Sequence, residues 1–345
     1  MVNERMYGLG AEPSAIRELF AYGMVRKAEI GAENVFDFSI GNPSVPAPDA
    51  VKQVVLELMD EDLALARLHA GSGRSARAPG RGRPYSPSLR RARPAEQCTH
   101  GSAAAGLAIS ISAVTEPGDE VIIIAPFFPE YKVWIGTAGC TCVEVPAHVP
   151  DFQLDIDALA QAIGRRPLSS STRRTTRWAP YSRENLEAFA ALLARKEEEL
   201  GRKLYVISDE PYREITYGAE VPYVPCVWPR TIVCYSYSKS LSLPGERIGY
   251  LYVSDLMDDA REVSTAVAGA GRALGFICAP VLFQRVIARC IDEPSDVAAY
   301  AANRELLTTG LGGWDTSSWN HRARSTVGAR ARGRRAGVQR SREGS

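Results

Sequence analysis

A single lysine stands among hydroxyl residues in residues 235–249, which read YSYSKSLSLPGERIG. The amine of Lys239 can form an imine with an aldehyde and, once released from it, can carry a proton between neighbouring atoms. The hydroxyls of Ser236 and Ser238 and the guanidinium of Arg247 are donors suited to a phosphate dianion, to which arginine offers a bidentate fork. This pattern predicts carbonyl chemistry at a lysine that lies next to an anion site.

A second candidate is the acidic stretch that precedes this lysine. Asp209 follows the apolar run 204–208 and stands three residues before Tyr212. Open α/β sheets place ligand contacts at the carboxyl ends of their strands, so Asp209 is a candidate binding residue. The ordinary alternative is an aspartate that caps the start of a helix.

Three shorter stretches carry weaker signals. Residues 101–108 (GSAAAGLA) open a helix with small side chains, which leaves the first amides accessible to a phosphate, although small residues also serve close packing. Residues 126–131 (PFFPEY) place aromatic rings after a strand, where an aromatic is more often part of the core. Residues 38–43 (FSIGNP) contain a Gly-Asn-Pro sequence that is also typical of an ordinary turn.

Taken together and in this order, the stretches resemble the class I and II pyridoxal-phosphate (PLP) aminotransferases of fold type I. The lysine segment matches every fixed position of that family's S-x-S-K-x-x-x-x-P-G-x-R-x-G pattern, and residues 209–212 match its D-E-x-Y element. Residues 126–131 resemble P-x-[YFW]-P-x-Y, and residues 40–43 resemble I-G-[NEQ]-P.

The resemblance implies a role for each matching residue. Lys239 would be the catalytic Schiff-base lysine, Asp209 would pair with the pyridine nitrogen, and Tyr212 would hydrogen-bond the 3-oxygen of the ring. Phe128 would stack on the ring, and Gly41 would touch the substrate carboxylate. The phosphate would be bound by Ser236, Ser238, Arg247 and the amides of Ala103 and Ala104.

The activity implied is transfer of an amino group between an L-amino acid and a 2-oxo acid by a cytoplasmic homodimer in amino-acid metabolism. Another fold type I reaction, C–S β-elimination, uses the same lysine, aspartate and arginine, and pyruvate production without an oxo-acid acceptor would identify it. A third possibility is an inactive homologue that binds PLP without turnover. Ser236 and Lys239 also form S-x-x-K, but the S-D-N and K-T-G sequences of penicillin-recognising enzymes do not occur.

The elements that must position these residues alternate between helical and strand patterns. Residues 103–114 and 186–200 predict helices, and the apolar runs 120–125, 204–208, 231–235 and 249–253 predict strands. This alternation predicts an α/β fold with a mainly parallel central sheet and flanking helices. The resemblance implies, in addition, a truncated small domain. The expected organisation is residues 1–45 in the small domain, 46–285 as the large PLP-binding domain and 286–309 as the return to the small domain.

Three segments depart from the family pattern: 71–97, 165–180 and the tail 310–345, all rich in Arg, Gly, Pro, Ser and Ala. They stand where the resemblance leads one to expect a tyrosine for the partner's phosphate, an asparagine for the 3-oxygen and the arginine that clamps the substrate carboxylate. One hypothesis is out-of-frame translation of a GC-rich gene, which the coding DNA would test, and the alternative is a natural, degenerate homologue. Binding of nucleic acid by the tail is not expected, because such composition is usually only solvated chain.

Composition agrees with an ordinary globular protein. The 345 residues carry a net charge of +1 and 45% hydrophobic residues, so a sizeable core can form and no global attraction to nucleic acid or membrane is expected. The seven cysteines show no C-x-x-C pair, which predicts reduced thiols and no metal site. Without an apolar leader or a long apolar run, cytoplasmic location is the expectation.

Overall fold

The computed structural model of the chain describes residues 2–11, 15–61, 97–98, 102–164, 172–174, 180–312, 316–319 and 328–331. The chain divides into two compact units, Met1–Pro46 and Ala47–Ser345. The smaller unit contains α1 (Glu4–Ala11), α2 (Ala15–Ile30) and the 3-10 helix η1 (Ala32–Asn34). The domain boundaries expected at residues 45, 285 and 309 stay predictions.

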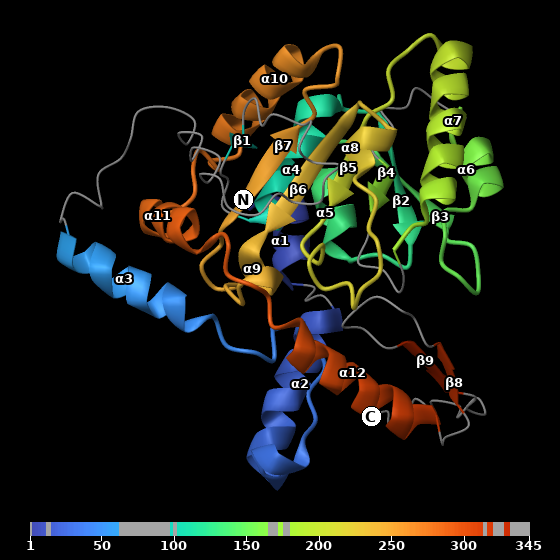
Figure 1. The fold of residues 1–345 in the computed structure, drawn as a ribbon. Coiled ribbons are helices and arrows are strands. Elements are labelled where there is room, and N and C mark those ends of the chain that lie inside the picture. Colours follow the sequence, from blue (N-terminus) through green and yellow to red (C-terminus); the bar gives the residue numbers. More distant parts are fainter. Residues whose placement is uncertain are drawn as a thin grey trace. The chain divides into compact units, whose positions relative to one another are not determined.

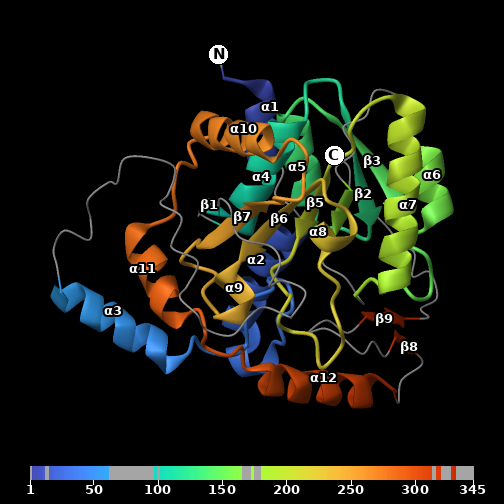
Figure 2. The ribbon, with the colours of Figure 1, turned by 45° about the horizontal axis from the view of Figure 1, so that its top comes forward.

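The larger unit carries the sheet and the remaining helices (Figures 1 and 2). In chain order these are α3 (Asp49–Glu61), β1 (Gln97–Cys98), α4 (Ala103–Val114), β2 (Glu120–Ala125), α5 (Glu130–Thr137), β3 (Thr141–Pro146), α6 (Ile156–Ala162), β4 (Thr172–Arg174), α7 (Arg183–Leu200), β5 (Val206–Asp209), α8 (Val224–Val227), β6 (Thr231–Ser236), α9 (Tyr237–Ser240), β7 (Gly249–Val253), α10 (Ala260–Ala273), α11 (Val281–Cys290), α12 (Val297–Gly312), β8 (Thr316–Trp319) and β9 (Gly328–Ala331).

The central sheet has the strand order β1-β7-β6-β5-β4-β2-β3. The strands from β6 through β3 pair in parallel, whereas β7 pairs antiparallel with both β6 and β1. The prediction of an α/β fold with a mainly parallel sheet is therefore confirmed. Because parallel neighbours end at the same edge, the carboxyl ends of β5 and β6 lie side by side.

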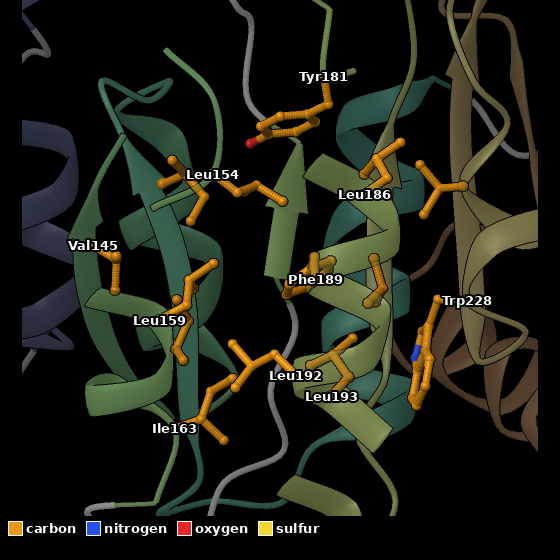
Figure 3. Close-up of a cluster of buried hydrophobic side chains, with 14 of the residues drawn as sticks. Val145, Leu154, Leu159, Ile163, Tyr181, Leu186, Phe189, Leu192, Leu193 and Trp228 are labelled. Atoms are coloured by element: carbon orange, nitrogen blue, oxygen red, sulfur yellow. The ribbon is translucent and has the colours of Figure 1, made fainter. Parts of the chain in front are cut away.

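Alternation along β2 explains why helices cover both faces of the sheet. Ile122 and Ile124 belong to one buried apolar cluster, and Val121 and Ile123 belong to another. The first cluster packs α6 and α7 on the sheet, as Figure 3 shows for the side chains of these helices. The second packs α4, α5 and α10 on the opposite face. A strand buried on both faces is apolar throughout, which is why its sequence has no polar alternation.

A third buried cluster joins α3 and α11 to the lysine segment. It contains Val51 and Leu58 of α3, Val286 of α11, and Tyr237 and Leu241 at the two ends of the short helix α9. The segment that carries Lys239 is thus held in place by its packing against α3 and α11.

The helix and strand predictions are confirmed, with small changes at their ends. α4, β2 and β7 have the expected bounds, whereas the helix expected at 186–200 begins at Arg183 because the Ser182 hydroxyl accepts a hydrogen bond from the Asn185 amide at 3.1 Å. That helix ends at Gly201, which has a left-handed φ of 65°. Lys239 lies in the short helix α9, which was not among the predicted elements.

Two of the atypical segments contribute described residues that the sequence did not assign to strands. β4, within 165–180, pairs in parallel with β2 and β5, and β8 pairs antiparallel with β9 in the tail. Strand pairing uses the main chain, so it does not require the apolar side chains by which strands are recognised in a sequence. Most of 71–97, of 165–180 and of 310–345 lies outside the described residues.

In the part of the chain that the structure describes, no helix combines the length and the apolar character needed to cross a bilayer. Six cysteines are free thiols: Cys140, Cys142, Cys226, Cys234, Cys278 and Cys290.

Candidate active site

The carboxyl end of β5 places Asp209 at the edge of the sheet. Its Oδ2 accepts a hydrogen bond of 2.6 Å from the Tyr131 hydroxyl, which comes from the start of α5. Tyr212 follows in the next turn, and its ring centroid lies 5.5 Å from Lys239 Nζ. The structure therefore brings Tyr212 next to Lys239, while the contact of Tyr212 with the 3-oxygen of the cofactor stays a prediction.

β6 ends next to β5 and leads directly into α9. Ser236 caps this helix, because its hydroxyl accepts a hydrogen bond from the Ser238 amide at 3.1 Å. The Ser236 and Ser238 hydroxyls also lie 2.5 Å apart, so the two predicted phosphate donors form one cluster. Burial lowers the pKa of Lys239 below its usual value, because the ammonium form is less well solvated there. A larger fraction of the amine is then neutral and nucleophilic at a given pH.

Arg247 joins the lysine segment to the start of α4. Its Nη2 donates to the Ser102 hydroxyl at 3.0 Å, and its Nη1 donates to the Pro244 carbonyl at 3.0 Å. Ser102 is the cap of α4 and accepts a hydrogen bond from the Ala105 amide at 3.3 Å. The guanidinium thus lies at the helix end whose first residues are the predicted phosphate-binding Ala103 and Ala104.

Close backbone packing holds α4 and β7 against β6 at this edge. Gly249 pairs with Ser236, and a Cβ added to this glycine would lie 2.2 Å from the Tyr235 carbonyl oxygen. A Cβ at Gly106 of α4 would lie 3.1 Å from Leu251 Cδ2. Glycine is therefore needed at Gly249 for the strands to approach as closely as they do.

Phe128 belongs to an aromatic cluster after β2. Its ring meets the ring of Tyr131 edge-on, with centroids 5.8 Å apart and an interplanar angle of 84°. Trp134 lies 6.2 Å from Phe128 and 6.0 Å from Tyr131. Through Tyr131 this cluster contacts Asp209, so Phe128 and Asp209 are near neighbours, while stacking of Phe128 on a cofactor ring stays a prediction.

Gly41 lies in the smaller unit, Met1–Pro46, whereas the other predicted residues lie in the larger unit. Its contact with the substrate carboxylate stays a prediction. Most of the segments 71–97 and 165–180 lies outside the described residues. These are the segments where the family pattern leads one to expect a phosphate-binding tyrosine and an asparagine.

Sequence reasoning did not assign a role to Tyr131 or Ser102. Tyr131 is the last fixed position of the P-x-[YFW]-P-x-Y stretch, and Ser102 precedes a helical pattern as capping residues do, so both signals were available.

The sequence analysis also did not predict an ion pair between Glu210, the residue after Asp209, and Arg213. Arg213 Nη1 lies 2.7 Å from Glu210 Oε2, and Ser208 donates to the other carboxylate oxygen at 2.7 Å. Arg213 Nη2 donates to the Val221 carbonyl at 3.1 Å. The pair is almost fully buried, and it ties the turn after β5 to the chain that follows it. Its i,i+3 spacing is common in any sequence and does not single it out.

The chemistry of the donor set fits PLP. A guanidinium, neighbouring hydroxyls and the amino end of α4 match a phosphate dianion, and an amine with a lowered pKa matches an aldehyde. An aspartate at the end of β5 matches a pyridinium nitrogen. Arg247, Ser102, Ser236 and Ser238 would hold the phosphate.

The chain is similar to known aminotransferases. A family model described as "Aminotransferase class I and II" matches residues 33–174 and 181–318. A solved amino transferase from Eubacterium rectale is 43% identical, with a TM-score of 0.84 over 94% of this chain and 83% of that chain. Aspartate aminotransferase from Thermus thermophilus, solved with maleate, shares the fold at 21% identity with a TM-score of 0.76, over 94% of this chain and 83% of that one.

Among curated relatives, an aspartate aminotransferase of Pinus pinaster is 29% identical over 231 residues, which are 63% of this chain and 44% of that protein. The match to a probable N-acetyl-LL-diaminopimelate aminotransferase of Bacillus subtilis is 28% identical and spans 64% of this chain and 55% of the relative. The chain thus spans about half the length of these relatives. The family match itself is interrupted at residues 175–180, inside one of the atypical segments.

Proposed function

The chain belongs to the family of class I and II aminotransferases, and we propose that it transfers an amino group between an L-amino acid and a 2-oxo acid with Lys239 as the catalytic residue. The observation that carries the proposal is the convergence of three separate motifs at one sheet edge. Tyr212 lies against Lys239, and Arg247 is hydrogen-bonded to the cap of α4. PLP, the cofactor of this family, supplies an aldehyde and an electron-withdrawing ring when bound.

Different residues of the site bind different parts of PLP. Arg247, the Ser236–Ser238 pair and the amides of Ala103 and Ala104 bind the phosphate and so fix the position of the ring. The Asp209 carboxylate holds a proton at the pyridine nitrogen, and the Tyr212 hydroxyl binds the 3-oxygen. Phe128 stacks on one side of the ring.

Lys239 does the chemical work. Its amine would bind the aldehyde that PLP supplies, and when free it would act as the base and acid that moves a proton from the substrate Cα. Burial favours the neutral amine that this proton transfer needs. The cytoplasm is the proposed location.

Absorption spectroscopy tests this function. The protein with added PLP is expected to show a visible band that shifts on addition of an amino-acid mixture, with release of 2-oxo acid. Lys239→Ala should lose the covalent band and slow oxo-acid release by roughly 10²- to 10⁴-fold, the usual worth of a positioned acid–base group. Lys52→Ala, a change of an exposed lysine on α3, is the control and should behave as the unaltered protein does.

Three outcomes separate the alternatives. A covalent band with no oxo-acid release would show a PLP-binding protein without transaminase activity. Release of pyruvate and thiol from a sulfur amino acid without an acceptor would show β-elimination. Equal bands in the Lys239→Ala and Lys52→Ala proteins would overturn the role of Lys239.

A further inference from the structure

A chain of buried polar side chains passes beside the helix that carries Lys239. The Tyr235 hydroxyl, in β6, donates a hydrogen bond of 2.8 Å to the hydroxyl of Ser240, the last residue of α9. The same tyrosine is hydrogen-bonded to the carboxyl group of Glu214, in the turn that follows β5. Tyr235 therefore joins that turn to the residue directly after Lys239.

The Tyr235 ring is rigidly held. It is 1% exposed and belongs to the buried cluster that packs α3 and α11 against the lysine segment. Tyr250 of β7 stacks on it, with ring centroids 4.9 Å apart and an interplanar angle of 21°, and Tyr237 of α9 meets it edge-on at 5.1 Å. Because the ring cannot turn without displacing these neighbours, its hydroxyl has a fixed place.

Ser240 is held at its side chain and at its main chain. Its hydroxyl accepts from Tyr235, and its carbonyl oxygen accepts a hydrogen bond of 2.9 Å from the Ser295 hydroxyl, which precedes α12. The helix α9 has only 4 residues. A helix this short is not stable by itself, so the position of Lys239 within it depends on contacts from outside the helix.

The chain can stay hydrogen-bonded whether or not Glu214 carries a proton. A tyrosine hydroxyl has one proton to donate, and its oxygen can also accept. With Glu214 protonated, the carboxyl group can donate to Tyr235 while Tyr235 donates to Ser240. With Glu214 ionised, Tyr235 donates to the carboxylate and Ser240 donates to Tyr235. Arg213 and Glu210, the charged neighbours of Glu214, form an ion pair with each other at 2.7 Å.

We propose that Tyr235 is a positioning residue for Lys239, which fixes the place of the lysine amine through Ser240. Through Glu214 the same tyrosine fixes the turn that carries Tyr212, whose ring centroid lies 5.5 Å from the amine. The inference rests on the proposed function, in which Lys239 moves a proton and a small displacement of its amine is costly. It explains a buried hydroxyl where a phenylalanine would fill the same space and need no polar partner.

The test compares Tyr235→Phe with Tyr205→Phe. Tyr205 donates a hydrogen bond of 2.6 Å to Asp259 Oδ2 and precedes β5, at the opposite end of that strand from Asp209, so it is a control for the loss of a tyrosine hydrogen bond. Tyr235→Phe should lower kcat by roughly 3- to 10-fold, the usual worth of one hydrogen bond, with less change in KM for the amino acid. Tyr205→Phe should leave both constants unchanged.

A second readout needs neither PLP nor turnover. Burial lowers the pKa of Lys239, so this pKa reports where the amine lies. In protein with lysine labelled with ¹³C at Cε, the Lys239 resonance, assigned by its loss in Lys239→Arg, can be titrated by NMR. In Tyr235→Phe the pKa of Lys239 should rise toward its usual value, because a less tightly held α9 exposes the amine to water. In Tyr205→Phe it should not move.

Ser240→Ala breaks the same chain at its other end and keeps the tyrosine. It should raise the pKa of Lys239 and lower kcat as Tyr235→Phe does, and the two changes together should do no more than either alone. If Tyr235→Phe does not fold, Ser240→Ala carries the test.

The outcomes are distinct. A pKa of Lys239 that is the same in Tyr235→Phe and Ser240→Ala as in the unaltered protein would overturn the positioning role. An equal loss of kcat in Tyr235→Phe and Tyr205→Phe would also overturn it. Failure of the proposed function itself is seen separately, as absence of turnover in an unaltered protein whose Lys239 pKa still responds to Tyr235→Phe.

Discussion

Glu214 carries a buried carboxyl group two residues after Tyr212. Burial raises its pKa to about 7, and its hydrogen bond with Tyr235 only partly offsets this effect. Its Oε2 is buried with no hydrogen-bond partner among the described residues. An ionised carboxylate in such a place is costly, so the group keeps its proton to a higher pH in the folded chain than in the unfolded one.

This residue makes stability depend on pH. The folded state binds the extra proton between the usual pKa of 4.5 and about 7, so the free energy of unfolding falls as pH rises through that window. Glu214→Gln should abolish the fall, and above pH 7 it should be more stable than the unaltered protein by roughly 3 kcal/mol. Urea unfolding at pH 5 and pH 8 measures this difference.

Glu198→Gln, at an exposed position of α7, is the control and should follow the unaltered protein at both pH values. If Glu214→Gln loses the same stability between pH 5 and pH 8 as the control does, the buried carboxyl group is not the cause.

The junction of β6 and β7 is the element on which the lysine segment depends. Gly249 pairs with Ser236, and an added Cβ would lie 2.2 Å from the Tyr235 carbonyl oxygen and 3.1 Å from Ser236 Cα. Both neighbours are backbone atoms, which cannot move aside as a flexible side chain does. Gly249→Ala should therefore destabilise the fold by about 1–3 kcal/mol and displace Ser236, which weakens PLP binding.

Gly269 offers the matched control, because it lies in α10 with no atom within 4 Å of an added Cβ. Gly269→Ala should instead raise the free energy of unfolding by about 0.5–1 kcal/mol through its better helix propensity. Thermal unfolding and PLP titration of the two variants check both effects. Equal stability of the two variants would contradict the close approach of β7 to β6.

At the scale of the whole molecule, the unit Met1–Pro46 exposes large apolar side chains. Phe36 and Phe38 are 82% and 80% exposed, and Tyr22 and Val25 of α2 are 64% and 56% exposed. Exposed apolar groups in such number indicate a contact surface. Aminotransferases of this fold are commonly dimeric, and the homodimer of this chain is a prediction: if it forms through this surface, a second copy covers these residues.

Light scattering with size exclusion should give twice the 37.5 kDa of one chain. Tyr22→Glu combined with Val25→Glu should shift the mass to that of one chain, because charged groups disfavour an apolar interface. Val149→Glu, at an exposed apolar position of the larger unit, should leave the dimer intact. A single-chain mass for the unaltered protein would refute the homodimer.

The sequence by itself determined the elements and the identities of the chemical groups. The apolar runs of β2 and β7 and the small residues of α4 each depend on local spacing, and the structure has these elements at the expected bounds. The strand expected at 204–208 is present as β5, which ends one residue later, at Asp209. Such features can be read locally because side-chain periodicity and capping act over a few residues.

Only the tertiary structure decided which of these groups meet. The hydrogen bond from Tyr131 to Asp209 and that from Arg247 to Ser102 join residues that no local pattern relates. β4 has no apolar pattern and was found only through its pairing with β2 and β5. These contacts arise from the order of strands in the sheet, which brings together segments of the chain that nothing in their own sequence can locate.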